Sequence, residues 1–328
     1  MNKFTAIVLI LGSLFVALAQ HEHAGTTDFP ILNLSVDSRS IGLAGASAAI
    51  PNSLYGVFTN PASIATDTGN INVALGYISI MDGLWGIPAA ASRSFGKYGV
   101  FSVNMFSANT SVENRDAQNN LTGEKSYYSY INGGVSWGYK IFDGLYTGAS
   151  FKGVYNKIAE YSAGALYIDA GIQYRLKSER LIYGFTIHNL GFMAEKYASE
   201  SEASLPLTFE GGISFVPRTI PSLRLAIDVN KKTGDYVNFE PAVEVNIYKK
   251  VLVMRLGYAF SQRDASHVID LLQNSEDDDY QKSNLSSLCA GAGLKTDISG
   301  KMVVLDFGIK FATVAIAPSI SVSGILSL

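Results

Sequence analysis

The feature that most constrains this chain is an alternation of apolar and polar residues at a period of two. It runs through many short segments after residue 70 and is typical of a β-strand whose two faces meet different surroundings. In one segment the apolar face carries Val237, Phe239, Pro241, Val243, Val245 and Ile247. The opposite face carries Tyr236, Asn238, Glu240, Ala242, Glu244 and Asn246. The same pattern recurs over Leu166–Arg175, Leu207–Phe215, Leu223–Asn230 and Met302–Phe311.

About fourteen such segments follow one another, and most hold roughly 8–12 residues, the length of a tilted strand that crosses a bilayer. An even number of strands is typical of single-chain bacterial outer-membrane barrels. We therefore predict an all-β fold, a transmembrane antiparallel up-and-down β-barrel over residues 70–328. The predicted strands begin near residues 70, 85, 98, 126, 145, 163, 181, 207, 223, 236, 251, 285, 302 and 314.

The predicted connections differ in length according to the end of the barrel on which they lie. The long ones, Ala108–Lys125, Leu190–Pro206 and Gln262–Asn284, follow the third, seventh and eleventh strands, so an up-and-down chain places all three at one end. Outer-membrane barrels show this asymmetry, with short turns on one side and long loops on the other. A soluble β-sandwich could alternate as well, but it has no reason to sort loop lengths in this way.

The N-terminus and the charge content indicate export to a membrane. Residues 1–19 read as a signal peptide, with Lys3, the apolar run Ala6–Leu18 and a small-residue cleavage motif at Ala17-Leu18-Ala19. No stretch holds the roughly 20 apolar residues of a transmembrane helix, so strands must cross the bilayer. Charged residues make up 16% of the chain and the net charge is −3, which disfavours a nucleic-acid partner. We expect an outer-membrane location with lipid around the barrel.

Residues 20–69 do not alternate, and we interpret them as a plug, or hatch-like segment, inside the barrel. The stretch Ser38–Ala65 is rich in small residues and contains Asn60-Pro61-Ala62. A barrel of this strand number is narrow enough for such a segment to fill it.

Charged residues of both signs fall on the predicted inner face of the strands. In a barrel without a wide pore such groups pair with one another across the lumen, so we interpret them as a structural network. The residues are Asp169, Arg175, Glu210, Arg224, Asp228, Glu240, Glu244, Arg255, Asp306 and Lys310.

No motif indicates a catalytic or metal centre. A Gly-x-Ser-x-Gly elbow is absent from the sequence, and His188 on the predicted inner face has no visible nucleophile beside it. The pair His21 and His23, and the acidic run Glu276-Asp277-Asp278-Asp279, could hold a metal. Exposed polar sequence is the simpler interpretation of both. We expect no enzyme activity, no cofactor and no metal.

Several motifs, in their order along the chain, resemble the PorV/PorQ family, which is related to FadL-type fatty-acid channels. The plug carries Arg39, a run from Gly42 through Gly45 to Ala46, and a run from Tyr55 to Ala65 that holds Asn60, Pro61 and Ala62. Downstream follow Ile187–Gly191, Leu205–Thr208 and Arg255–Tyr258.

The resemblance implies a non-enzymatic outer-membrane component of the type IX secretion system. Such a protein would bind translocon subunits and the C-terminal domains of secreted cargo, or anchor surface partner proteins. The long loops would do this work, with Met193, Tyr197 and Tyr280 as contacts, since aromatic and Met side chains are enriched at interfaces. The more distant FadL resemblance implies an alternative, a channel for hydrophobic small molecules. A purely structural barrel is a third reading.

Overall fold

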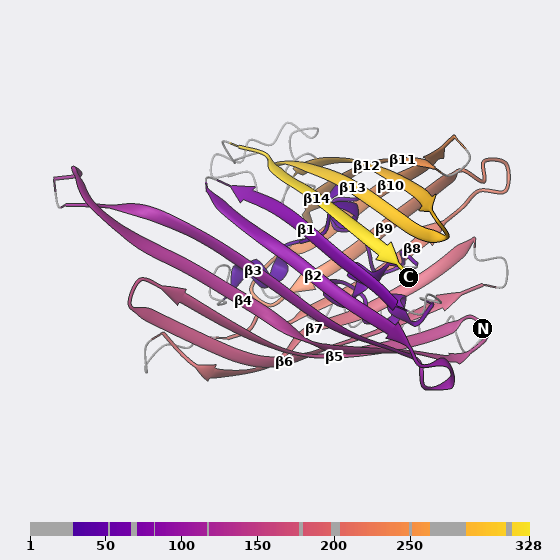
Figure 1. Ribbon diagram of the computed structural model, residues 1–328, viewed down its shortest axis with the longest axis horizontal. Coiled ribbons are helices and arrows are strands. Elements are labelled where there is room, and N and C mark those ends of the chain that lie inside the picture. Colours follow the sequence, from indigo (N-terminus) through magenta and orange to yellow (C-terminus); the bar gives the residue numbers. More distant parts are fainter. Residues whose placement is uncertain are drawn as a thin grey trace, which may run out of the picture.

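In the computed structural model the described residues form a closed barrel of fourteen antiparallel strands (Figure 1). Each strand pairs with its neighbours in sequence, and β1 closes the barrel by pairing with β14, for example Val73 opposite Leu326. The predicted fold class, including the number and order of the strands, is therefore confirmed. The structure describes residues 29–51, 53–66, 71–81, 83–116, 118–176, 180–197, 204–248, 251–262, 287–312 and 317–328.

The strands begin within a few residues of the predicted positions. Their bounds are β1 (Ile71–Met81), β2 (Leu84–Ser94), β3 (Val100–Arg115), β4 (Leu121–Phe142), β5 (Leu145–Ile158), β6 (Tyr161–Arg175), β7 (Leu181–Glu195), β8 (Thr208–Phe215), β9 (Leu223–Lys232), β10 (Val237–Ile247), β11 (Leu252–Ser261), β12 (Ser287–Ile298), β13 (Lys301–Ala312) and β14 (Ser319–Ser327).

The outer face of the barrel is apolar and exposed. Along β1, the outward side chains Ile71, Val73, Leu75 and Tyr77 are 39–61% exposed, whereas the intervening Asn72, Ala74 and Ile78 are buried. This alternation repeats around the wall, and an exposed apolar belt of this kind is what a bilayer core requires. Among the described residues, no helix is long and apolar enough to cross a membrane.

The predicted strand length of roughly 8–12 residues was too short for β3 to β7, which hold 16, 22, 14, 15 and 15 residues. The predicted loop Ala108–Lys125 is mostly a β-hairpin, paired from Asn109 opposite Ser129 to Arg115 opposite Leu121, that projects beyond the rest of the barrel (Figure 1). Both faces of this hairpin meet water, so nothing forces its sequence to alternate. We call the end of the barrel where it projects the hairpin end.

The other two long loops of the prediction differ from the structure or lie largely outside its described residues. The predicted loop Leu190–Pro206 begins too early, because β7 continues to Glu195. Nearly all of the predicted loop Gln262–Asn284 lies outside the described residues, as do the signal peptide over residues 1–19 and the acidic run.

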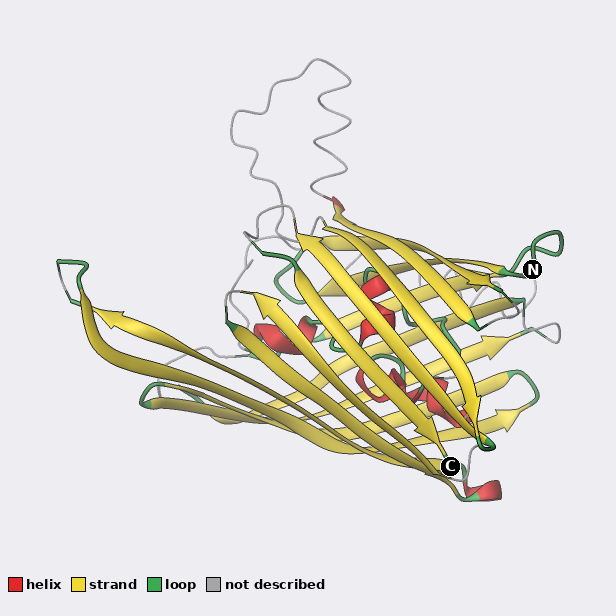
Figure 2. Cartoon of the chain, turned by 45° about the horizontal axis from the view of Figure 1, so that its top comes forward, coloured by secondary structure: helices red, strands yellow, loops and turns green. Residues whose placement is uncertain are grey.

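The segment from residue 29 to residue 66 lies inside the barrel, where its short helices fill the lumen (Figure 2). We call this segment the plug. Most of its apolar side chains, such as Phe29, Ile41, Leu54 and Ile64, are buried. The helices are η1 (Pro30–Asn33), α2 (Ser38–Gly42), η2 (Leu54–Phe58) and η3 (Pro61–Thr66), and a further short helix, η4 (Gly96–Tyr98), lies in the turn between β2 and β3.

Inward-facing glycines of the wall let the plug backbone approach closely. A Cβ at Gly148 in β5 would lie 2.3 Å from the carbonyl carbon of Pro61, and one at Gly171 in β6 would lie 2.1 Å from Oδ1 of Asn60. At Gly308 in β13, a Cβ would lie 2.5 Å from the carbonyl oxygen of Ser38. Real Cβ contacts are not this short, so glycine is required on the wall where the plug docks.

Candidate functional site

The turn Asn60-Pro61-Ala62 fixes the middle of the plug against the wall. Asn60 is fully buried, and its Nδ2 donates to the carbonyl oxygen of Ala48 at 2.7 Å and to that of Ile172 in β6 at 3.3 Å. Its Oδ1 accepts from the backbone N–H of Ala62 at 3.0 Å. One asparagine therefore joins two parts of the plug to each other and to the barrel.

A chain of alternating charges links the plug to three strands. The Arg39 guanidinium donates to both carboxylate oxygens of Glu244 in β10, at 2.9 and 3.0 Å. Glu244 also accepts from Nε of Arg255 in β11 at 2.9 Å, and Nη1 of Arg255 donates to Asp306 in β13 at 2.6 Å. These side chains are mostly buried, and bidentate pairs of this type are among the stronger polar contacts. We call this group the latch.

Asp37 caps the helix that carries Arg39. Its Oδ1 accepts from the backbone N–H of Ser40 at 3.0 Å, and its other oxygen is buried without a hydrogen-bond partner. Burial raises the pKa of Asp37 above its usual value, against the opposing effect of the hydrogen bond from Ser40.

A second buried ion pair lies on the opposite wall. Nζ of Lys152 in β5 is 2.7 Å from Asp169 in β6, and it also donates to the carbonyl oxygen of Val57 in the plug at 2.6 Å. Both charged side chains are less than 5% exposed. Asp169 further accepts from the backbone N–H of Asn189 at 2.8 Å. The plug therefore supplies a hydrogen-bond acceptor for Lys152, and the wall supplies a donor for Asp169.

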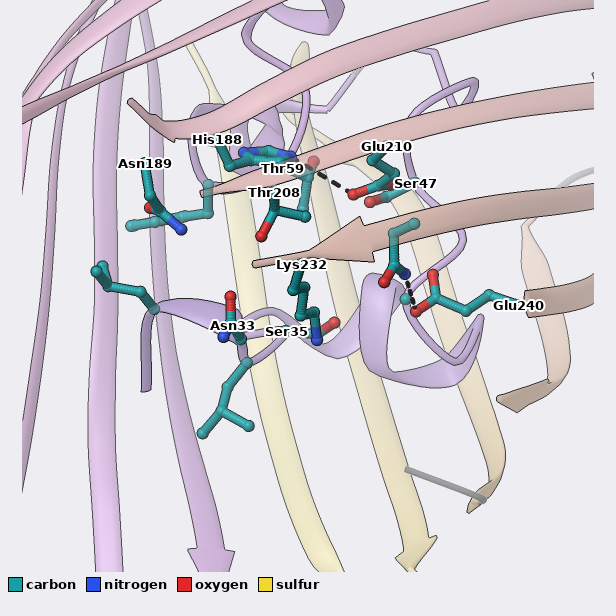
Figure 3. Close-up of a pocket in the computed structure, with 15 residues that line it drawn as sticks. Asn33, Ser35, Ser47, Thr59, His188, Asn189, Thr208, Glu210, Lys232 and Glu240 are labelled. Carbon is teal, nitrogen blue, oxygen red and sulfur yellow. Dashed lines mark hydrogen bonds and ion pairs between the residues drawn. The ribbon is translucent and has the colours of Figure 1, made fainter. Parts of the chain in front are cut away.

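Three carboxylates from adjacent strands form a third group, and Figure 3 shows two of them, Glu210 and Glu240. Asp228 in β9 accepts from the backbone N–H groups of Ser47 and Ala48, each at 2.7 Å. Glu240 in β10 accepts from the Asn230 amide at 2.8 Å. Glu210 in β8 lies 3.4 Å from Nε2 of His188.

The remaining residues of the predicted lumen network also face inward, and the structure places them apart from the three groups above. Arg175 reaches Oγ1 of Thr66 in the plug at 3.2 Å, and Arg224 donates to Ser214 at 2.9 Å. Lys310 lines a cavity at the hairpin end. Three of the ten predicted residues, Arg175, Asp228 and Glu244, therefore form hydrogen bonds with the plug.

That cavity, of about 340 Å³, lies between the plug and the wall. Apolar side chains contributed by both make up much of its surface, including Ile41 and Ala44 of the plug and Ile78 and Ile80 of β1. The polar lining includes Lys232, Asp235, Asn238, Glu240 and Lys310. A smaller space of about 80 Å³, drawn in Figure 3, adjoins it beside His188 and Glu210.

The first residues of the plug fill an apolar pocket of the wall at the hairpin end. Phe29 and Ile31 pack in one buried cluster with Phe106, Tyr130 and Val154, among others. Unlike the charged middle of the lumen, this part of the inner wall is apolar.

The predicted partner contacts Met193 and Tyr197 both touch this cluster. The Tyr197 ring lies 6.5 Å from the Phe29 ring, and its hydroxyl accepts from the Asn156 amide at 2.6 Å. The third, Tyr280, lies outside the described residues. Both described side chains therefore have partners within the chain.

Sequence reasoning missed several residues that hold the plug. Lys152 is one, and Gln173 is another, whose Nε2 donates to the carbonyl oxygens of Ala48 and Ile50 at 2.8 and 3.0 Å. Alternation alone could have found both, since Lys152 shares its face with Gly148 and Gln173 shares its face with Asp169. No signal within the sequence marks which plug carbonyl each one reaches.

No protein-family model matches this chain, and no curated protein matches its sequence significantly. Solved structures do match its fold. The monoaromatic hydrocarbon channel CymD aligns with a TM-score of 0.63 and 14% identity over 90% of this chain and 98% of its own. The toluene transporter TodX of Pseudomonas putida gives 0.62 and 10%, over 90% and 97%. A Pseudomonas aeruginosa FadL homologue gives 0.51 and 11%, over 89% and 97%. The chain is thus similar in fold to FadL-type barrels, and the PorV/PorQ resemblance stays a prediction.

Proposed function

We propose that this protein is a plugged outer-membrane channel for small hydrophobic molecules. The observation that carries the proposal is the cavity of about 340 Å³ between plug and wall, which combines apolar walls with a few polar groups. Ligand pockets typically measure about 300–1,000 Å³ and are built in this way. The fold likeness to hydrocarbon channels supports the same function, and the apolar belt on the strands supports an outer-membrane location.

The polar inner face is compatible with an apolar cargo. Charged groups on a lumen wall disfavour an apolar ligand, but the plug engages several of them. Glu244 binds Arg39, Asp228 binds two plug N–H groups, and Lys152 binds both Asp169 and a plug carbonyl. Much of the surface left to a ligand comes from apolar side chains at the hairpin end.

The test is ligand binding by the detergent-purified full chain, measured by calorimetry with toluene and with laurate. Ala259 is 7% exposed and lines the cavity, so Ala259→Phe should fill the space and abolish binding. Val73→Phe places a phenyl ring on the outer face instead, where the side chain is 43% exposed, and should bind as the wild type does. If neither ligand binds the wild type, or if both variants bind equally well, the cavity is not the ligand site.

The secretion role implied by the PorV/PorQ resemblance stands as a separate proposal. Its test is purification from outer membranes in mild detergent with mass spectrometry of the associated proteins. Stoichiometric translocon subunits, or cargo sharing a C-terminal domain, would support it. A lone barrel carrying bound lipid or hydrocarbon would support the channel instead.

A further inference from the structure

The carboxylates of Glu210, Asp228 and Glu240 are short of positive partners. One oxygen from each residue lies within 4.8 Å of the others. Among the described residues, neither Asp228 nor Glu240 has a Lys or Arg nitrogen within ion-pair distance, and Glu210 has only His188, at 3.4 Å. By contrast, Glu244 contacts two arginines. It lies four residues after Glu240 on the same face of β10. Three carboxylates this close repel one another unless a cation or a proton lies between them.

A second observation is that oxygens of this group are buried and lack partners. Asp228 is 1% exposed, and its Oδ1 has no hydrogen-bond partner even though Oδ2 accepts two. Oε1 of Glu210 also lacks one. Thr186, which lies directly opposite Glu210 in the strand pairing, is fully buried with an unpartnered hydroxyl. Burying such oxygens without a partner is costly, so those of Asp228 and Glu210 point to a cation or a proton between the carboxylates.

We propose that Glu210, Asp228 and Glu240 bind one divalent cation, with Ca²⁺ the best fit, that ties the plug to the barrel wall. All the donors are oxygens, which hard cations prefer, and Ca²⁺ takes 6–8 of them at about 2.3–2.6 Å. Two oxygens on opposite sides of such an ion lie about 4.6–5.2 Å apart, so oxygens within 4.8 Å of one another can share one ion. The adjoining space of about 80 Å³ has room for the waters that complete the shell.

The strand geometry presents the three groups together. Asp228 lies opposite Glu240 in the β9–β10 pairing and opposite Gly212 in the β8–β9 pairing. A Cβ at Gly212 would lie 1.9 Å from Oδ1 of Asp228, so glycine leaves the space that this oxygen occupies. Because Asp228 also holds the plug turn through Ser47 and Ala48, an ion here stabilises the seated plug.

The test uses the detergent-purified full chain, stripped with EGTA and titrated with CaCl₂ by calorimetry and by thermal melting. We expect one Ca²⁺ per chain and a melting temperature that rises with Ca²⁺ concentration. Asp228→Asn and Glu240→Gln should each weaken binding by about tenfold or more. Glu240→Gln keeps an oxygen that can accept from Asn230, so it serves as the second variant if Asp228→Asn does not fold.

Controls separate this site from other acidic groups. Asp143→Asn, in an exposed pair with Lys140, should bind as the wild type does. A variant of the acidic run, with Glu276→Gln, Asp277→Asn, Asp278→Asn and Asp279→Asn combined, should also keep the site. The proposal is overturned by a wild type that shows neither Ca²⁺ binding nor a melting shift, by cluster variants that bind unchanged, or by binding lost only with the acidic run. If low pH stabilises the protein and no Ca²⁺ binds, the three carboxylates share a proton instead of an ion, and the proposal is overturned.

Discussion

Removing the Arg39 side chain should release the plug without unfolding the barrel. Arg39 makes two charge-assisted hydrogen bonds to Glu244, and no other residue of helix α2 forms an ion pair among the described residues. In Arg39→Ala both bonds are lost, while Glu244 keeps its contact with Arg255. The barrel wall stays paired strand to strand, so the loss acts on the docking of the plug.

The magnitude follows from the contacts. Hydrogen bonds to charged groups contribute about 1.5–3 kcal/mol each. Two such bonds at the low end of this range would sum to about 3 kcal/mol. The Arg39 side chain is 21% exposed and Arg255 still compensates Glu244, so solvent screening reduces the loss to about 2 kcal/mol. At 1.4 kcal/mol per factor of ten, the released plug becomes about 30-fold more populated.

Cys289 reports this population. It is the only cysteine of the sequence, it is fully buried, and it packs in one cluster with Ala44 of the plug. The rate of its reaction with N-ethylmaleimide should follow the fraction of molecules with a released plug when reseating is fast. We therefore expect Arg39→Ala to react about 30-fold faster than the wild type, as measured by mass spectrometry.

Two controls test the reasoning. Arg93→Ala removes an exposed arginine of β2 that lies over the Phe95 ring, so its labelling rate should not change. Arg39→Lys keeps the charge but loses the bidentate geometry and should give an intermediate rate. Heat-modifiable migration on gels checks that each barrel is folded. If folded Arg39→Ala reacts no faster than the wild type, the latch does not hold the plug.

Three further substitutions probe the plug and its contacts. In Gly148→Ala the new Cβ would meet the Pro61 carbonyl carbon at 2.3 Å, so Cys289 labelling should speed up, whereas Gly153→Ala, whose nearest neighbour is a Leu166 methyl at 3.3 Å, should leave it unchanged. Lys152→Met leaves Asp169 buried without its lysine, so urea unfolding should show a loss of about 3–5 kcal/mol; Lys140→Met, in an exposed pair, should leave the urea midpoint nearly unchanged. Burial raises the pKa of Asp37, so above that pKa the charged carboxylate destabilises the folded state. Below the unfolded pKa of about 3.9, Asp37 is protonated in both the folded and the unfolded state, and this effect disappears. Asp37→Asn should therefore raise the melting temperature at pH 7 and less so as the pH falls towards about 4, and a gain that grows in acid would contradict this reasoning.

The barrel could be predicted from the sequence because lipid and lumen impose opposite demands on successive residues. In β10, Val243 and Val245 face outward while Glu244 faces the plug, and this contrast is visible in the sequence. The same reasoning failed in the projecting hairpin, where Val112 and Lys125 are exposed and the strands have water on both faces. Strand length is therefore predictable only where the two faces of a strand differ in environment.

The contacts of the plug could not be predicted in the same way. Small residues around Gly42 and Gly45 indicated a segment that packs closely, but Arg39 and Glu244 are 205 residues apart, and no local pattern joins them. The glycines that receive the plug, such as Gly148 and Gly171, look like ordinary strand glycines until the opposing backbone is in place. Which wall residue a plug residue meets depends on the strand register of the wall and on the position of the plug along the barrel axis. A single sequence gives neither for a segment without regular strands.

The polarity of the lumen and the apolar nature of the proposed cargo are reconciled by the plug. A wall that carries Asp169, Asp228 and Glu244 would repel a hydrocarbon if those groups faced an open pore. Instead each one binds a plug group or a wall cation, and apolar residues line the pocket that Phe29 fills at the hairpin end. Passage through this lumen then requires the plug to move, and these polar contacts determine the free energy of that movement. Weakening them should therefore raise both the labelling of Cys289 and the rate of ligand passage, and a variant that raises one without the other would separate plug release from transport.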